Sequence, residues 1–158
     1  MNFLRFLLLL SLGVWIGSLI FFAAVAQTSF SVLPSPHQAG LVVRGSLIKL
    51  HWIGMVSGAV FLVTSMFYER AVLLRARSLA PIAVVLMLVL TSVSQFAIIP
   101  KMDRLRASEQ ELSLPAVNSP VRAQFDSLHA WSVRTENAVL ILGIAALYSV
   151  ARRLAPRA

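Results

Sequence analysis

Residues 6–30 read FLLLLSLGVWIGSLIFFAAVAQTSF and contain no charged side chain. An apolar run of this length can cross the roughly 30 Å hydrocarbon core of a bilayer as a single α-helix. Three more apolar runs follow, and together they predict four membrane spans at about residues 5–33, 47–68, 79–99 and 129–150. Residues 120–128 are amphipathic and are expected to lie at the interface before the last span. The predicted fold is all-α, an antiparallel bundle of four transmembrane helices that forms one membrane domain over residues 1–158.

The composition of the chain supports this prediction. Apolar residues make up 58% and charged residues 13% of the sequence, whereas charged residues are roughly 25% of a soluble domain. The net charge is +8, but the arginines flank the apolar runs and form no patch. They therefore indicate membrane topology rather than a nucleic-acid partner, and the expected partner is the lipid bilayer. The chain has no cysteine, which excludes disulfides, thiolate catalysis and zinc–thiolate sites.

The first apolar run has a second interpretation. Arg5 followed by apolar residues, with Ala-Val-Ala at 24–26 before Gln27, resembles a secretory signal peptide with its cleavage site. The apolar core of a signal peptide is usually about 7–15 residues long, however, and this run is longer. We therefore favour a retained helix over cleavage near residue 26. Ser35 before Pro36 predicts the start of the next helix, with serine as its N-cap.

Four spans place both termini on the same side of the membrane. With the termini inside, the inner side carries short basic tails and one short basic connection at residues 69–78. The positive-inside rule then favours cytoplasmic termini, although Lys and Arg are balanced between the two sides. We expect a multi-pass protein of the bacterial inner (plasma) membrane in this orientation.

Residues 125–137, FDSLHAWSVRTEN, lead into the fourth span and hold its polar side chains. His129, Ser132 and Glu136 recur at helical spacing, so they share one face, and Asn137 follows directly. Ionisable residues in membrane segments are rare and are usually placed for a function. This stretch is the first candidate binding site.

Each of the other spans has one polar residue near the same membrane depth. Gln27 ends an outward-running helix, and His51 begins an inward-running one. Gln95 and Glu136 repeat that relation in the second half of the chain. We therefore expect these four side chains to converge on inward faces at the outer end of the bundle.

Two glycine pairs predict close helix packing. Gly13 and Gly17 lie in the first span, and Gly54 and Gly58 lie in the second. Small residues collect where membrane helices meet. We therefore expect both glycine faces to point into the bundle, although either pair could also pack between copies of the chain.

Each polar residue also has a purely structural explanation. Gln27 and Gln95 are typical of hydrogen bonds between helices, His51 of an interfacial residue, and His129 of a helix anchor. Glu136 is the hardest to explain in this way. A metal could use His129, Glu136 and His51, and His51 with His129 could ligate haem, but the spacing requires neither. The chain contains no nucleotide, hydrolase or zinc-protease motif.

The chain resembles the transmembrane-protein-205-like proteins, also called domain of unknown function 4149. The matching residues near the N-terminus are Trp15, Gly17, Phe21 or Phe22, Ala26, Phe30, Leu33, Pro34, Ala39 and Gly40. Phe125, His129 and Ser132 match an aromatic-x-x-x-His-x-x-Ser pattern near the C-terminus. The resemblance implies a four-helix membrane protein and supplies no reaction. The family often has asparagine where this chain has Glu136, and here Asn137 comes one residue later.

Three classes of function fit these observations. The first is binding or transport of a small solute, proton or metal ion through the outer polar cluster. The second is a structural or partner-binding membrane subunit, including a homo-oligomer. The third is a haem- or quinone-linked redox protein that uses His51 and His129. We rank them in this order, favour a non-enzymatic protein, and find no cofactor that the sequence requires.

Overall fold

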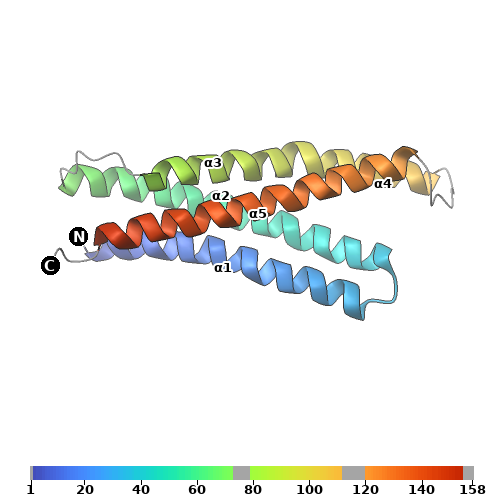
Figure 1. Ribbon diagram of the computed structural model, residues 1–158, viewed down its shortest axis with the longest axis horizontal. Helices are drawn as coiled ribbons and strands as arrows, with labels where there is room; N and C mark the ends of the chain where they lie inside the picture. The colour runs from blue at the N-terminus through green and yellow to red at the C-terminus, as the bar shows by residue number, and fades with distance from the viewer. Residues whose placement is uncertain (1, 73–78, 112–119, 155–158) are drawn as a thin grey trace.

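The computed structural model of the chain describes residues 2–72, 79–111 and 120–154 (Figure 1). Its elements are α1 (Asn2–Val32), α2 (Pro36–Val72), α3 (Leu79–Val93), the π-helix η1 (Ser94–Ile98), α4 (Ile99–Glu111) and α5 (Pro120–Leu154). The helices α3, η1 and α4 follow one another directly, so the described residues form four long helical rods and no strand. The predicted all-α four-helix bundle is confirmed.

The four rods have the length and composition of membrane spans. The candidate spans are Asn2–Val32, Pro36–Tyr68, Leu79–Ala107 and Pro120–Arg153, with mean hydropathies of 2.4, 1.6, 2.5 and 1.3. In the 18-residue apolar segment of each span, only 28–44% of the residues are buried within the chain. Most apolar side chains therefore face outward, where a lipid bilayer and not water would solvate them.

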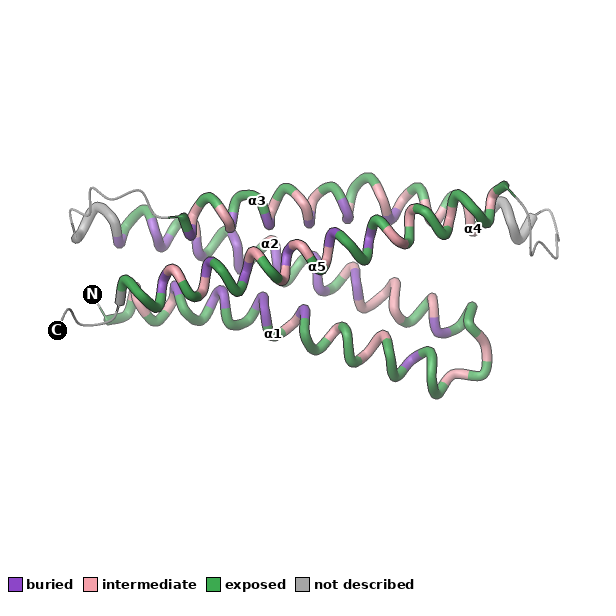
Figure 2. The backbone as a smooth tube through the Cα atoms, viewed as in Figure 1, coloured by how far each residue is buried: buried purple, intermediate pink, exposed green. Residues whose placement is uncertain are grey.

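The start of α1 and the end of α5 lie at one end of the bundle, which we call the terminal end (Figure 1). Toward the opposite end, the hairpin of α1 and α2 diverges from α4 and α5 (Figure 1). Burial follows this shape (Figure 2), because in α1 the buried residues lie between Leu8 and Leu19 except for Ser29. In α5 no residue before Ser132 is buried. We call the diverging end the open end.

Trp15 determines how α1 and α2 pack. Its indole is 1% exposed and lies against Gly54 and Gly58 of α2. A Cβ atom built on Gly58 would approach Trp15 Cζ3 to 2.8 Å, and one on Gly54 would approach Trp15 Cε2 to 2.7 Å. The two glycines therefore form the recess that receives a large side chain from α1.

The other glycine pair does not pack inside the bundle, and the inward face predicted for α1 is wrong. Gly13 and Gly17 are exposed, and no neighbouring atom lies within 4 Å of a Cβ built on either. The reason is that Trp15 and Leu12 point into the bundle, which turns the small residues of α1 outward. Glycine is needed on only one of the two helices that meet.

The helix boundaries also differ from the expected spans. Ser35 caps α2 as predicted, since its Oγ accepts a hydrogen bond from the Gln38 N–H at 3.2 Å. The third span was expected to end at residue 99, but the rod continues, and Pro100 is the second residue of α4. The expected interfacial segment 120–128 belongs to the single helix α5. Most of the basic connection 69–78 and residues 112–119 before α5 lie outside the described residues.

Candidate functional site

Four polar side chains from three rods meet near the middle of the rods, and not at the outer end expected from the sequence, because the rods extend beyond the predicted spans. His51 of α2 is 1% exposed, and its Nδ1 lies 2.7 Å from Gln95 Oε1 of η1. Its Nε2 lies 2.8 Å from Glu136 Oε1 of α5. Ser94 of η1 donates a 3.3 Å hydrogen bond to the same Glu136 oxygen. We call these residues, His51, Ser94, Gln95 and Glu136, the polar cluster.

The π-helix places two consecutive residues of one rod in the polar cluster. The Ile99 N–H bonds the Ser94 carbonyl, five residues earlier, which is the wide turn of a π-helix. Pro100 has no N–H, and its ring would crowd the carbonyl four residues before it in a regular helix. A wide turn directly before Pro100 relieves that crowding. Ser94 then reaches toward α5, while Gln95 reaches toward α2.

The buried imidazole of His51 can form its hydrogen bonds with Gln95 and Glu136 in two arrangements. If both oxygens accept, His51 donates from both ring nitrogens and forms an imidazolium–carboxylate pair with Glu136. If the Gln95 amide is turned so that its nitrogen donates to Nδ1, the ring is neutral and donates only to Glu136. In both arrangements the His51 side chain is fully bonded, and Glu136 Oε1 is an acceptor.

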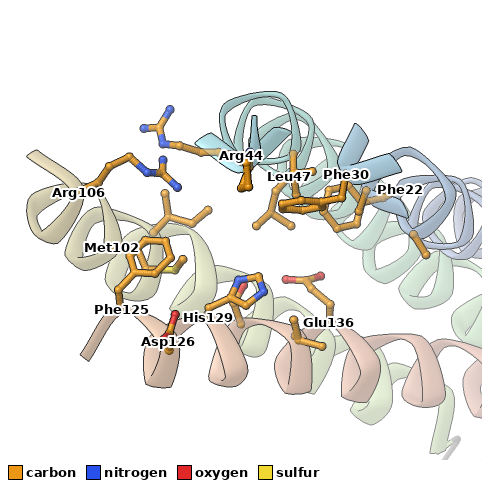
Figure 3. A pocket seen from close by; sticks show the side chains of 18 of the residues that line it. Phe22, Phe30, Arg44, Leu47, Met102, Arg106, Phe125, Asp126, His129 and Glu136 are labelled. Atoms are coloured by element: carbon orange, nitrogen blue, oxygen red, sulfur yellow. The ribbon is translucent and has the colours of Figure 1, made fainter. Parts of the chain in front are cut away.

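A groove of about 660 Å³ opens beside the polar cluster, between the α1–α2 hairpin and the α4–α5 side. The side chains of His129 and Glu136 point into it from α5, opposite Phe22 and Phe30 (Figure 3). Glu136 is 12% exposed. Its Oε1 is bonded to His51 and Ser94, and among the described residues no hydrogen bond to its Oε2 is found. The groove therefore contains a carboxylate oxygen with remaining bonding capacity.

The mouth of the groove is crossed by an ion pair between α2 and α4. Arg44 donates from Nε to Asp103 Oδ1 at 2.6 Å and from Nη2 to Asp103 Oδ2 at 2.5 Å. Arg106 lies 3.9 Å from Asp103 Oδ1, and its guanidinium lies 5.4 Å from the ring centre of Phe125. Two-point Arg–carboxylate pairs fix geometry well. This group ties α2, α4 and α5 together where the helices diverge.

One known protein family matches the sequence of this chain. The family model described as Domain of unknown function (DUF4149) matches residues 10–111. The chain belongs to this family. The match includes His51 and Gln95 but ends before α5, so Glu136 lies outside the matched segment. No curated protein and no solved structure matches the chain significantly.

The structure of this DUF4149 protein brings together some of the predicted residues. His51, Gln95 and Glu136 are in contact, and the buried Ser132 lines the groove near them. His129 and Asn137 also line the groove, but both are exposed and neither bonds the polar cluster.

Gln27 is the predicted residue that does not converge. It is exposed and does not line the groove. The reason is the rotation of α1 set by Trp15, because Gln27 lies on the same helical face as Gly13 and Gly17, and this face points outward. Its expected inward position is therefore wrong.

Ser94, Arg44 and Asp103 are parts of the site that the sequence analysis missed. Ser94 stands off the helical face of Gln95, and only the wide turn before Pro100 brings it into the polar cluster. The signal for the ion pair was present, since Arg44 and Asp103 are opposite charges near the same end of neighbouring spans.

The geometry bears on the metal and haem hypotheses. No group of three or more His, Asp or Glu side chains suited to a metal ion occurs in the described part of the chain. Both His51 nitrogens already face polar partners within 2.8 Å. His51 therefore has no nitrogen directed at a haem iron or at a metal shared with His129 in this arrangement.

Proposed function

We propose that this DUF4149 protein binds a small solute in the groove, as a membrane binding protein or transporter, with Glu136 as the polar anchor. The observation that supports this is the Glu136 carboxylate. One of its oxygens is held by His51 and Ser94, and the other has no hydrogen-bond partner among the described residues, while the side chain lines the groove. A fixed carboxylate beside an apolar cavity is typical of a binding site.

The shape of the groove is consistent with a ligand larger than an ion. Ligand pockets usually measure about 300–1,000 Å³ and are mostly apolar with a few placed polar groups. The groove volume of about 660 Å³ falls in this range. Phe22, Phe30, Leu47 and Leu140 line it together with the polar groups described above.

Photolabelling tests this proposal. The full chain in lipid nanodiscs is labelled with the neutral probe 3-trifluoromethyl-3-phenyldiazirine, and the labelled residues are mapped by mass spectrometry. Ala26 lines the groove, whereas the neighbouring Ala24 is exposed and does not. We expect saturable labelling of groove residues that falls several-fold in Ala26→Trp and stays unchanged in Ala24→Trp. Groove labelling that does not saturate, or that Ala26→Trp leaves unchanged, would refute solute binding there.

A structural role is the second candidate, and a specific observation favours it. His51 is almost fully buried and joins η1 and α5 to α2 through Gln95 and Glu136. If the polar cluster only holds the helices together, Glu136→Gln lowers the thermal stability in detergent and leaves groove labelling intact. In this role the protein would act with a second copy or another membrane protein.

We also propose the orientation expected from the sequence, with both termini in the cytoplasm and the open end outside a bacterial inner membrane. We propose as well that the chain is grouped with the transmembrane-protein-205-like proteins. The chain has no cysteine, so a single Gln38→Cys substitution gives one label site at the exposed start of α2. A membrane-impermeant maleimide should label it in intact cells. Labelling only after lysis would reverse the orientation.

A further inference from the structure

We propose that the groove selects organic cations with an apolar body, and that Glu136 Oε2 is their counter-ion. This inference rests on the proposed solute binding and adds the chemical class of the solute. It follows from the distribution of charges around the groove and from the aromatic residues on its walls.

The arginines of the groove already lie beside carboxylates, and Arg44 and Arg106 share one of them, Asp103. Arg44 is bonded at two points to Asp103, and Arg106 lies beside the same carboxylate. Arg122 lies 3.3 Å from Asp126. All three arginines lie at the open end, toward the groove mouth (Figure 3 labels Arg44 and Arg106). An anionic solute would have to compete with these carboxylates for each arginine.

Among the described residues the carboxylate farther inside pairs with no arginine, and its charge stays unbalanced in the arrangement with a neutral His51. Glu136 is mostly buried, and its Oε1 takes the hydrogen bonds of His51 and Ser94. Glu136 lines the groove, and its Oε2 has no hydrogen-bond partner among the described residues. A carboxylate oxygen away from water is stabilised by a cation or a hydrogen-bond donor. His51 is 1% exposed and fixed by Gln95, so a solute meets Oε2 rather than the imidazole. Charge complementarity at this depth favours a cation.

The walls favour a cation that carries apolar groups. Phe22 and Phe30 face Glu136 across the groove, and Phe125 lies nearer the mouth (Figure 3). Aromatic faces attract organic cations, and the attraction is stronger where water is excluded. A small hydrated metal ion would use neither these rings nor the volume of about 660 Å³. An ammonium or phosphonium ion with aryl or alkyl groups would use both.

Two probe ions of the same shape and opposite charge test the inference. Binding of tetraphenylphosphonium and tetraphenylborate to the full chain in neutral maltoside micelles is measured by equilibrium dialysis, with protein-free micelles subtracted. We expect saturable binding of the phosphonium at one site and binding of the borate at least about tenfold weaker. Glu136→Gln keeps the size of the side chain and an oxygen for His51, and should weaken phosphonium binding about tenfold or more.

Asp126→Asn is the matched control, because it removes a carboxylate from the same helix nearer the mouth, where Arg122 already pairs with it. It should change phosphonium binding less than about twofold. If both variants weaken binding equally, general electrostatic attraction explains the result and the specific inference fails. Ala26→Trp, which fills the groove without touching the charge, should also abolish phosphonium binding and serves as the second variant if Glu136→Gln does not fold.

The outcomes separate this inference from the proposed function. Saturable labelling by the neutral diazirine together with no phosphonium binding, or with equal binding of both ions, would overturn the cation inference and leave solute binding in place. If the unmodified protein shows neither saturable labelling of the groove nor ion binding, both the cation inference and the proposed solute binding are overturned.

Discussion

Gly54→Ala should destabilise this membrane protein, whereas Gly17→Ala should not. The Cβ added at residue 54 would approach Trp15 Cε2 to 2.7 Å and Cδ1 to 3.1 Å, and these atoms belong to a rigid indole. Overpacking of this kind costs about 1–3 kcal/mol. Replacing glycine by alanine within a helix returns up to about 1 kcal/mol. The two effects together give a loss of about 0–3 kcal/mol in the free energy of unfolding, and we expect a value near the middle of this range.

The matched control is on the helix that Gly54 contacts. No atom lies within 4 Å of a Cβ at Gly17, so Gly17→Ala keeps only the gain in helix propensity, between zero and about 1 kcal/mol. Reversible unfolding in mixed dodecyl sulfate–maltoside micelles, followed by circular dichroism, measures both values. Trp15→Phe in the Gly54→Ala background should recover part of the loss, because the smaller ring frees space. Equal stabilities of the two alanine variants, or a larger loss at Gly17, would refute the packing derived from Trp15.

Two further perturbations test the polar contacts. The first is a double-mutant cycle of Arg44→Gln and Asp103→Asn. We expect a coupling free energy of about 1 kcal/mol, which is the upper end for partly exposed ion pairs. A coupling of zero would show that the ion pair does not hold α2 to α4. His51→Ala removes the partner of two half-buried groups, Gln95 and Glu136, and should lower the free energy of unfolding by about 1–3 kcal/mol. His129→Ala, at an exposed position without a bonded partner in the polar cluster, should change it by less than about 0.5 kcal/mol. A His129→Ala loss as large as that of His51→Ala would contradict the burial difference, and the same unfolding measurement decides it.

The sequence predicted the parts of this structure that depend on composition and helical spacing. Long uncharged runs require membrane spans, because the bilayer leaves the backbone few alternatives. Helical spacing predicted which helix faces carry His51, Gln95 and Glu136, and their positions relative to the ends of the expected spans predicted a similar depth. The binding role of these residues stays a prediction.

Two features could not be predicted, for separate physical reasons. The rotation of α1 depends on which helix provides the recess and which provides the large side chain, and small residues on both helices left that choice open. Trp15 and Gly54 show the answer only once the helices are paired. The position of Ser94 depends on a π-turn, whose local sequence differs from a regular helix only by the following Pro100.

The third rod carries residues of both the polar cluster and the ion pair at the groove mouth, and the number of residues between them sets their relative orientation. Ser94 and Gln95 lie within the turn, and Asp103 lies eight residues after Gln95 on α4. Each residue of an α-helix advances the rotation by about 100°. Removing one residue from α4 between Pro100 and Asp103 would therefore rotate Asp103 away from Arg44 by about that angle, while Ser94, Gln95 and the preceding helix would keep their orientation. A single-residue deletion or insertion between the polar cluster and the mouth would thus separate the two, even though every interacting side chain is still present in the chain. The number of residues in this segment is therefore as much a part of the site as their identity.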